Sequence, residues 1–400
     1  MSIQVRPVHG EEGLREAALV HGTAFGHRFE DDRLEKVLLP ALGFLNVFGA
    51  FEDGKMVGVA VDQPLELTVP GGRFVKTRGL TWVGVLPTYR RRGVLTALMD
   101  HHVKGLRELG MPLSILWASE TTIYGRYGYG PATERISEAE IDNRHGAFGA
   151  PLEDDGRVVM IDDPSPVGVM REVLDAARPL IPGEVDRSDR DLVDQFNDAD
   201  KKEFRVAHVA ADGSHDAFAA YTVESDWPHD AYPQSRVHVS TLLASTDAGY
   251  AAMWRYLLDL DLTRTVRIRN RPLDDPIRWL LREWRYFHVK HVSDGLWLGL
   301  LDVPAALEAR GYAADGDLVL DVGGERIALS VSGGTASCST SDRDADIALG
   351  VSELSAAYLG GQRFGAMRRG LRLRELTPGA CERADAMFAA GREPWCSYEF

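Results

Sequence analysis

The most constraining feature of this 400-residue chain is the segment Val83–Leu95, in which a strand pattern runs through a basic loop directly into a helix pattern. Three consecutive arginines, Arg90–Arg92, precede Gly93, and apolar residues recur at helical spacing from Val94 onward. The N-terminus of a helix carries unpaired N–H groups and about half a positive charge, which suits a phosphate group. Glycine at position 93 would let the backbone approach that group closely. The segment therefore predicts a site for a ligand that contains a pyrophosphate.

The strand before the loop carries a second signal. Gly84 interrupts a strand of larger residues, and a glycine inside a strand often marks a bulge or a close approach by a ligand. The backbone groups of Val83 and Val85 would then be free to pair with amide groups of an extended ligand, as an added strand would. From the loop alone an alternative stays open, which is an exposed basic helix cap after a core strand.

A tyrosine-rich segment follows about 30 residues after the loop, beyond a predicted strand at 113–118. It reads Ser119-Glu120-Thr121-Thr122-Ile123-Tyr124-Gly125-Arg126-Tyr127-Gly128-Tyr129-Gly130. Together the two segments resemble the GNAT superfamily of N-acetyltransferases, in which a bulged strand precedes an Arg/Gln-x-x-Gly-x-Gly/Ala loop and a Tyr-x-x-x-Gly-Phe element follows the fifth strand. Leu95 stands where the superfamily usually has a small residue. We expect Tyr127 and Tyr129 to pack, and Tyr124 to act in catalysis.

The whole chain resembles one branch of that superfamily, the enhanced-intracellular-survival (Eis) family. The matching segments are Arg90–Leu95, Ile123–Thr133, Leu298–Leu307, Leu359–Gly361 and the final pair Glu399–Phe400. The resemblance implies an α/β (α+β) fold: two tandem GNAT-like mixed-sheet domains, of which only the first binds a cofactor, and then a sterol-carrier-like α+β domain. We place these domains at residues 1–150, 151–292 and 293–400. The resemblance also implies a homohexamer that acetylates amines, including aminoglycosides and lysine side chains.

The resemblance further implies roles for individual residues. Tyr124 matches the family's general acid, which protonates the departing coenzyme A thiolate, and the C-terminal carboxylate of Phe400 matches the general base. Glu399, beside that carboxylate, would either attract a cationic substrate or lie as a solvated rim residue. The residues implied to bind acetyl-CoA are Val83, Gly84, Val85, Arg91, Arg92, Gly93, Val94, Leu95, Thr96, Ser119 and Glu120. The tail 391–400 has no helical pattern, and ten extended residues reach about 33 Å, enough to cross a domain interface.

Composition limits the partners. The formal net charge is -15, from 60 acidic and 45 basic residues, which argues against nucleic acid or an anionic membrane and suits a cationic substrate such as a polyamine or an amino-sugar. The N-terminal sequence lacks the basic-then-apolar pattern of a signal peptide, and no apolar stretch approaches the roughly 20 residues of a membrane span. Three cysteines without metal-ligand spacing indicate free thiols. We therefore expect a cytoplasmic protein that needs no metal.

The middle third repeats the order strand, turn, helix and strand, at about 236–243, 248–259 and 265–269, which suggests a degenerate internal repeat. Its turn carries Asp247 where the first domain has arginines, and a carboxylate there would repel a pyrophosphate. We expect Thr246 or Asp247 to cap the helix, and the domain to hold no cofactor. An acidic stretch at 151–166, punctuated by proline and glycine, predicts the boundary before this domain.

Two alternatives to an acetyltransferase remain. The last third favours a lipid- or sterol-binding module, which would need a sizeable apolar tunnel, and the loop alone fits an acyl-CoA-sensing protein. Among residues near the motifs, His102 is expected to be a satisfied packing residue. Trp82 and Trp117 flank the strands of the loop, and we expect them to belong to the core rather than to a substrate platform.

Overall fold

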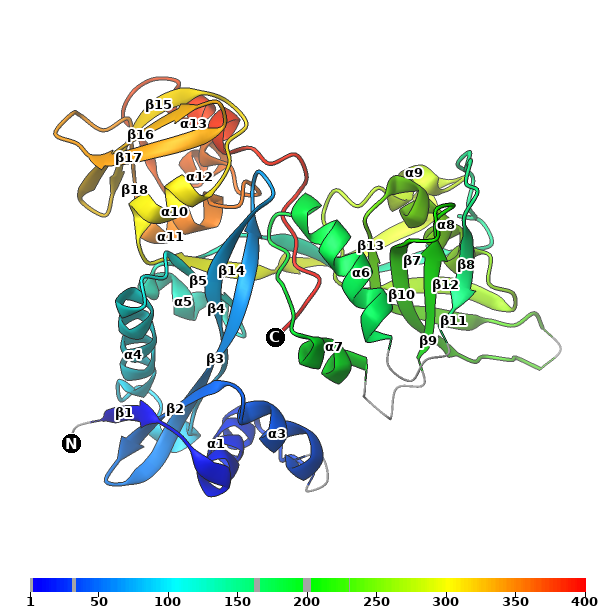
Figure 1. The fold of residues 1–400 in the computed structure, drawn as a ribbon, viewed down its shortest axis with the longest axis horizontal. Coiled ribbons are helices and arrows are strands. Elements are labelled where there is room, and N and C mark those ends of the chain that lie inside the picture. Colours follow the sequence, from blue (N-terminus) through cyan, green and yellow to red (C-terminus); the bar gives the residue numbers. More distant parts are fainter. Residues whose placement is uncertain (1–2, 31–33, 162–165, 197–202, 230) are drawn as a thin grey trace.

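Figure 1 shows the fold in a computed structural model, which describes residues 3–30, 34–161, 166–196, 203–229 and 231–400. This described part contains three β-sheets, each covered by its own helices. The sheets have the strand orders β1-β2-β3-β4-β5-β14-β6, β13-β7-β12-β11-β10-β9-β8 and β17-β16-β15-β18-β19. We refer to the three units built on them as the first, second and third domains.

The first domain is a mixed sheet in which β4 and β5 are parallel and their neighbours are antiparallel. Its strands are β1 (Gln4–Pro7), β2 (Asn46–Glu52), β3 (Lys55–Val69), β4 (Arg73–Val85), β5 (Leu113–Trp117), β6 (Tyr129–Pro131) and β14 (Leu296–Leu300). Its helices and helical turns are α1 (Gly10–Phe25), η1 (Leu34–Leu38), α3 (Leu39–Leu42), η2 (Pro87–Tyr89), α4 (Val94–Glu108), α5 (Thr121–Tyr124) and η3 (Gly125–Tyr127). The hairpin turn between β2 and β3 lies at Asp53–Gly54, and both residues have positive φ.

The second domain repeats this arrangement, with β11 parallel to β12 as β4 is to β5. Its strands are β7 (Glu134–Asp142), β8 (Arg157–Met160), β9 (Phe204–Val209), β10 (His215–Glu224), β11 (Ser235–Ala244), β12 (Thr263–Ile268) and β13 (Phe287–Asp294). Its helices and helical turns are α6 (Val167–Ala177), η4 (Arg178–Leu180), α7 (Asp189–Phe196), α8 (Asp247–Leu258), α9 (Ile277–Leu280) and η5 (Trp284–Tyr286). The internal repeat suggested by the sequence is therefore present in the fold.

The third domain is a smaller α+β unit. Its strands are β15 (Gly316–Val322), β16 (Glu325–Ser332), β17 (Thr335–Thr340), β18 (Ile347–Leu349) and β19 (Arg374–Glu375), and its helices are α10 (Val303–Ala309), α11 (Val351–Ala357), α12 (Phe364–Arg369) and α13 (Ala380–Phe388). The rings of Tyr312 and Phe364 both pack edge-on against Phe388, with centroids 5.4 and 5.0 Å away. Buried side chains of β15, β16, β18 and α13 join one apolar cluster with side chains of the first sheet, so the third domain packs on the first.

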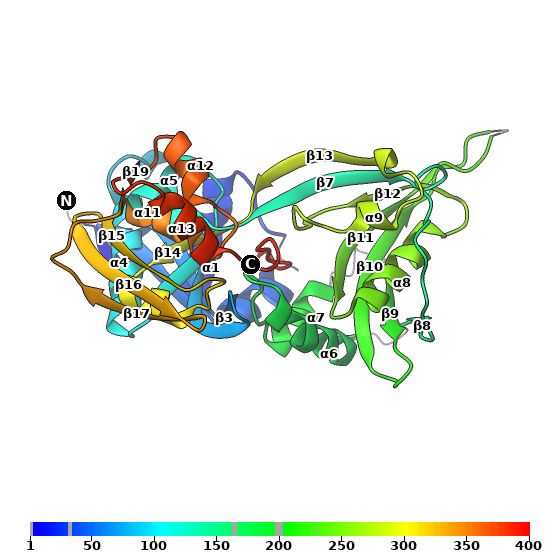
Figure 2. The same ribbon diagram turned by 90° about the horizontal axis from the view of Figure 1, so that it is seen from above.

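The predicted domain ranges need two corrections. β7 falls within 1–150 but pairs with β12 and β13 in the second sheet, and β14 falls within 293–400 but pairs with β5 and β6 in the first. Figure 2 shows β7 and β13 running side by side between the two domains. β14 suits a position between two strands because both of its faces are buried: Leu296, Leu298 and Leu300 lie on one face and Trp297 on the other. The chain thus leaves the first sheet after β6, builds the whole second sheet from β7 to β13, and returns to the first sheet with β14.

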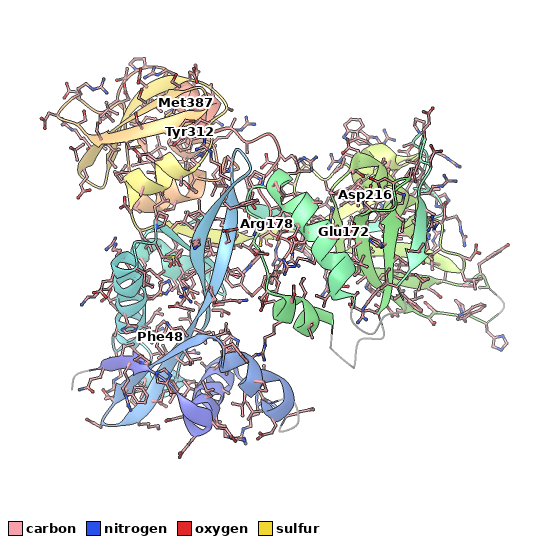
Figure 3. All side chains as sticks on the ribbon, viewed as in Figure 1. Phe48, Glu172, Arg178, Asp216, Tyr312 and Met387 are labelled. Atoms are coloured by element: carbon pink, nitrogen blue, oxygen red, sulfur yellow. The ribbon has the colours of Figure 1, made fainter. Side chains whose placement is uncertain are left out.

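The predicted boundary stretch at 151–166 is not wholly a linker. Its middle forms β8, which pairs with β9 at the edge of the second sheet, and residues 162–165 lie outside the described part. The first and second domains meet along the β3–β4 hairpin. There the guanidinium of Arg178 lies 2.7 Å from Glu66 and 4.0 Å from the ring of Phe74, in the position that Figure 3 labels between the two domains.

Candidate active site

A bulge in β4 lies just before the basic loop. Two residues of β4, Trp82 and Val83, face the single residue Ala60 of β3, and Trp82 has a left-handed φ of 54°. The parallel pairing of β4 with β5 lies at Gly79 and Leu80, before the bulge. The predicted irregularity near Gly84 is therefore real, but its centre lies at Trp82. The bulge separates the ends of the two parallel strands.

A cavity of about 930 Å³ occupies the space beyond these strand ends. All predicted cofactor residues except Arg92 line it, together with Tyr124. Its walls are Ala24, Phe25, Val83, Gly84, Val85, Tyr89, Arg90, Arg91, Gly93, Val94, Leu95, Thr96, Ser119, Glu120, Ile123, Tyr124, Arg126 and Tyr127. Two sequence segments about 30 residues apart thus enclose one cavity, as their resemblance to a shared motif implies.

The basic loop presents positive groups to this cavity. Arg91 and Gly93 both have positive φ, at 62° and 82°, and α4 begins at Val94 with no acidic residue in its first turn. The free N–H groups of that turn and the exposed Arg91 therefore supply the positive potential that a pyrophosphate requires. Arg90 also lines the cavity, and its Nη2 donates to the carbonyl of Ala24 at 2.8 Å.

Arg92 lies elsewhere. Its Nη2 donates to both carboxylate oxygens of Glu52, at 2.8 and 3.0 Å, and its guanidinium lies 4.9 Å from the ring of Tyr89. The sequence could not separate Arg92 from its two neighbours, because Glu52 is 40 residues away. The prediction that Arg92 contacts the cofactor is therefore not supported by its position.

Tyr124 is buried at the inner wall of the cavity, only 4% exposed. Burial, reinforced by the negative charge of Glu120, raises the pKa of Tyr124 to about 12, against an opposing hydrogen bond with Ser119. Its hydroxyl is consequently protonated at neutral pH. Tyr127, which we expected only to pack, also lines the cavity, and its hydroxyl lies 3.1 Å from that of Thr96.

Tyr129 and His102 form a buried polar network behind Tyr124. The ring nitrogens of His102 lie 2.5 Å from Asp62 Oδ1 and 3.0 Å from Ser114 Oγ, and Tyr129 donates to the same Ser114 at 2.9 Å. Each of these groups has a partner, which confirms that His102 is a satisfied packing residue. The ring of Tyr124 packs edge-on against Tyr129, 6.3 Å away, so this network supports its orientation.

The C-terminal tail reaches the first sheet close to the bulge. The backbone oxygen of Phe400 accepts a hydrogen bond from Thr81 Oγ1 at 3.2 Å, and the carbonyl of Tyr398 accepts one from Trp117 Nε1 at 3.1 Å. The ring of Phe400 fills the space over Gly79, where a Cβ would lie 2.5 Å from its Cε2. The tail therefore ends on β4, one residue before Trp82.

Glu399 is engaged by the protein itself. It forms an ion pair with Arg135, whose guanidinium also lies 4.7 Å from the ring of Trp117. The Glu399 side chain remains 55% exposed. Neither of the two expected roles, attraction of a cation or a solvated rim position, includes this partner, which lies 264 residues away in sequence.

Helix α1 contributes a wall that the sequence motifs did not indicate. Ala24 and Phe25 line the cavity, and His21 stacks on Trp82 at a centroid distance of 4.3 Å. Burial and the nearby His27 lower the pKa of His21 to about 4, so its ring is neutral. Trp82 therefore belongs to an aromatic cluster beside the cavity; it is only half buried, but it packs against a core cluster, in line with the expected core position.

Within the described ranges, no group of three or more histidine, cysteine, aspartate and glutamate side chains could hold a metal ion. Among the same residues, every helix is too short or too polar to cross a membrane. Cys338 is partly buried, and Cys381 and Cys396 are buried; all three are free thiols.

Comparison with known proteins identifies each domain. Residues 4–132 and residues 183–297 each match an acetyltransferase (GNAT) domain family, and residues 303–397 match a sterol carrier protein domain. N-acetyltransferase Eis of Mycobacterium tuberculosis is 34% identical over 380 residues, which cover 91% of both chains. The chain belongs to the Eis family of N-acetyltransferases. An uncharacterised N-acetyltransferase of Streptomyces griseus is 36% identical, over 87% of this chain and 88% of its own.

Solved structures agree with this assignment to the Eis family. Eis1 of Mycobacterium abscessus superposes with a TM-score of 0.87 at 29% identity, covering 99% of this chain and all of that one. A GCN5-related N-acetyltransferase from Anabaena variabilis has a TM-score of 0.86 at 19% identity and shares the fold. The protein is thus an acetyltransferase with tandem GNAT domains and a sterol-carrier-like domain. GNAT acetyltransferases use acetyl-CoA, and the cationic loop, the helix N-terminus free of acidic residues and the volume of the cavity fit that molecule.

Proposed function

We propose that this Eis-family enzyme transfers the acetyl group of acetyl-CoA to a primary amine of a cationic substrate, with Tyr124 as general acid and the carboxylate of Phe400 as general base. The observation that carries the proposal is the meeting of three elements at the bulge of β4. The cavity opens beyond the bulge, Tyr124 lines its inner wall, and the backbone oxygen of Phe400 is held by Thr81 just before it.

Different walls of the cavity would bind different parts of acetyl-CoA, which supplies a thioester-bound acetyl group. The N–H groups at the start of α4 and the side chain of Arg91 would hold the pyrophosphate. The backbone of β4 at Val83 and Val85, released from β5 beyond the bulge, would pair with the pantetheine amides. Ser119 and Glu120 line the opposite side. This assignment follows the predicted residues, with Arg92 removed and Arg90 added.

The amine must lose a proton to attack the thioester, because a primary amine has a pKa near 10. A carboxylate with an ordinary pKa of about 3.5 is a weak base, but it anchors the ammonium group and accepts its proton through an ordered water. The anchoring also orients the nitrogen for attack.

Tyr124 acts at the leaving group. Its pKa of about 12 lies above the value of about 8.5 for a thiol, so complete proton transfer to the sulfur stays uphill even when the full thiolate charge has developed there. The hydroxyl therefore contributes first as a protonated hydrogen-bond donor aimed at developing negative charge. Such a donor costs no reorganisation, because the burial that raises its pKa also fixes its ring against Tyr129.

The charge of the chain supports a cationic acceptor, such as an aminoglycoside, a polyamine or a lysine side chain. A net charge of -15 raises the local concentration of polycations. We propose in addition that the protein is a homohexamer in the cytoplasm, needs no metal and acts on neither nucleic acid nor membranes. The alternative of a lipid-binding or acyl-CoA-sensing module is less well supported, because the rings of Tyr312, Phe364 and Phe388 fill the interior of the third domain.

Release of free coenzyme A, followed with a thiol reagent, tests the proposal against a panel of amines. The panel contains an aminoglycoside, a polyamine, a lysine peptide and an uncharged sugar as the control. We expect acetyl-CoA-dependent release with at least one cationic amine and only background release with the sugar. Binding of acetyl-CoA without turnover on any amine would favour the sensing module instead.

A further inference from the structure

The second domain has a cleft at the place where the first domain has its cofactor cavity. This second cleft, of about 220 Å³, is lined by the end of β11, the first turn of α8 and the segment after β12. The end of β4, the first turn of α4 and the segment after β5 line the cavity of the first domain in the same order. Both clefts begin where a pair of parallel strands ends.

The second cleft is unsuited to a pyrophosphate. Thr246 caps α8 by accepting from the N–H of Gly249 at 3.0 Å, so one free donor of the helix is already used. Asp247 stands in the first turn, and the hydroxyl of Thr246 donates to a second carboxylate, Asp216, which Figure 3 labels beside α8. Two carboxylates thus lie where the first domain offers arginines and free N–H groups.

The C-terminal tail lies in this second cleft. Residues Arg392, Glu393 and Trp395 line it, and Figures 1 and 2 show the tail running between the two domains. Trp395 is 5% exposed and joins the apolar cluster around α6 of the second domain. The ring of Trp395 lies 5.0 Å from the buried guanidinium of Arg271, and the backbone N–H of Trp395 donates to the carbonyl of Pro182 at 2.8 Å.

The side-chain amide of Asn270 makes two hydrogen bonds to the tail. Its Oδ1 accepts from the indole Nε1 of Trp395 at 3.0 Å, and its Nδ2 donates to the carbonyl of Cys396 at 3.1 Å. Asn270 is the second residue after β12, just as Ser119 is the second residue after β5. The tail therefore takes hydrogen bonds from the position that, in the first domain, faces the cofactor.

From this anchor the tail crosses to the first domain. The N–H of Ser397 donates to Glu184 at 3.1 Å, and Glu184 is held by a buried ion pair with Arg187 at 3.1 Å. Tyr398 and Phe400 then contact the first domain, at Trp117 and Thr81. Phe400 is the fifth residue after Trp395, an extended reach of about 17 Å. A displacement at the anchor is thus transmitted to the terminus over a short span.

We propose that the second GNAT domain is a receptor for the C-terminal tail of its own chain: its former cofactor cleft binds Trp395, and Asn270 is a positioning residue for the carboxylate of Phe400. The proposal deepens the proposed function and rests on it, since that function makes the carboxylate the base. It also gives the second domain a role in catalysis without a cofactor of its own.

The test uses the full-length chain with Asn270→Gly, which removes both hydrogen bonds while suiting the positive φ of 52° at this position. We expect kcat to fall about tenfold or more while the KM for acetyl-CoA changes by less than about twofold, because misplacement of a catalytic group lowers turnover rather than cofactor binding. Carboxypeptidase should release Phe400 at least about tenfold faster than from the parent chain.

A second variant and a control keep the test decisive. Trp395→Phe keeps an aromatic ring and the backbone bond to Pro182 but loses the bond to Asn270 and part of the buried indole. Asn270 keeps its bond to Cys396, so both readings should shift in the same direction by a smaller factor. Trp279→Phe, in a tryptophan that is 74% exposed on the same domain, should change neither. A parent-like kcat together with parent-like protection of Phe400 in Asn270→Gly would overturn the proposal.

The two proposals fail in different ways. Extending the chain by one glycine after Phe400 tests the base alone, and full turnover there would contradict the proposed function. The carboxypeptidase reading does not depend on activity, so faster release of Phe400 from Asn270→Gly would still support the tail receptor in that case.

Discussion

The first and second domains of this chain share a sheet order and a parallel strand pair followed by a helix, yet they differ at one turn. In the first domain the turn is basic and α4 starts without a side-chain cap, so its N–H groups stay available. In the second domain Thr246 caps α8 and Asp247 follows it. We propose that these few side chains at the start of a helix decide whether the same fold offers a site for an anion.

The largest effect on activity is expected at Tyr124, because we propose a catalytic role for this residue of the first domain and none for any residue at the cleft of the second domain other than those that hold the tail. Tyr124→Phe should lower kcat by about 10² to 10³, because it removes the positioned donor at the leaving sulfur, while acetyl-CoA still binds. Steady-state kinetics of coenzyme A release measure it. Tyr232→Phe, an exposed tyrosine of the second domain, serves as the control, and near-parent turnover in Tyr124→Phe would remove this residue from the mechanism.

Blocking the terminus tests the contribution that crosses from one domain to the other. A C-terminal extension converts the carboxylate of Phe400 to a neutral amide and adds bulk at β4, so turnover should fall by about 10². Acetyl-CoA should bind with near-parent affinity, since its proposed site is built from β4, the loop and α4. An N-terminal extension of equal length is the control.

Two of the three loop arginines, Arg91 and Arg92, test whether the basic turn of the first domain binds the cofactor. Arg91→Glu should raise the KM for acetyl-CoA about tenfold, because it reverses charge beside the proposed pyrophosphate site. Arg92→Glu should have a smaller effect on this KM, since Arg92 is already paired with Glu52. Equal effects of the two variants, or an effect on the amine KM alone, would show that the loop is wrongly assigned.

The smallest effect is expected at the equivalent turn of the second domain. Asp247→Arg restores a basic residue there, but Asp216 and the capped helix remain. We expect kcat and both KM values within about twofold of the parent chain. A large change in the KM for acetyl-CoA would mean that this turn takes part in cofactor binding.

Local patterns predicted most of the cavity, because the features concerned lie close together in sequence. The start of α4 at Val94 and the cap at Thr246 both follow from residues within one turn of the chain. The superfamily resemblance then joined Tyr124 to the loop.

Features that depend on residues far apart in the chain could not be predicted from the sequence. The exchange of β7 and β14 between sheets depends on which strand completes each hydrogen-bond ladder, a choice with no local signal. Arg92 forms an ion pair with Glu52, and Glu399 forms one with Arg135; in both pairs only the fold brings the two side chains together. The burial of Trp395 in the second domain has the same origin.

The central claim is that, of two similar domains, only the first binds the cofactor. Isothermal titration of the full-length chain with coenzyme A measures it directly, because the stoichiometry counts the sites. The account predicts one site per chain, whose affinity falls on Arg91→Glu and is unchanged by Asp247→Arg. Two sites per chain, or one site that responds to Asp247→Arg and not to Arg91→Glu, would contradict it.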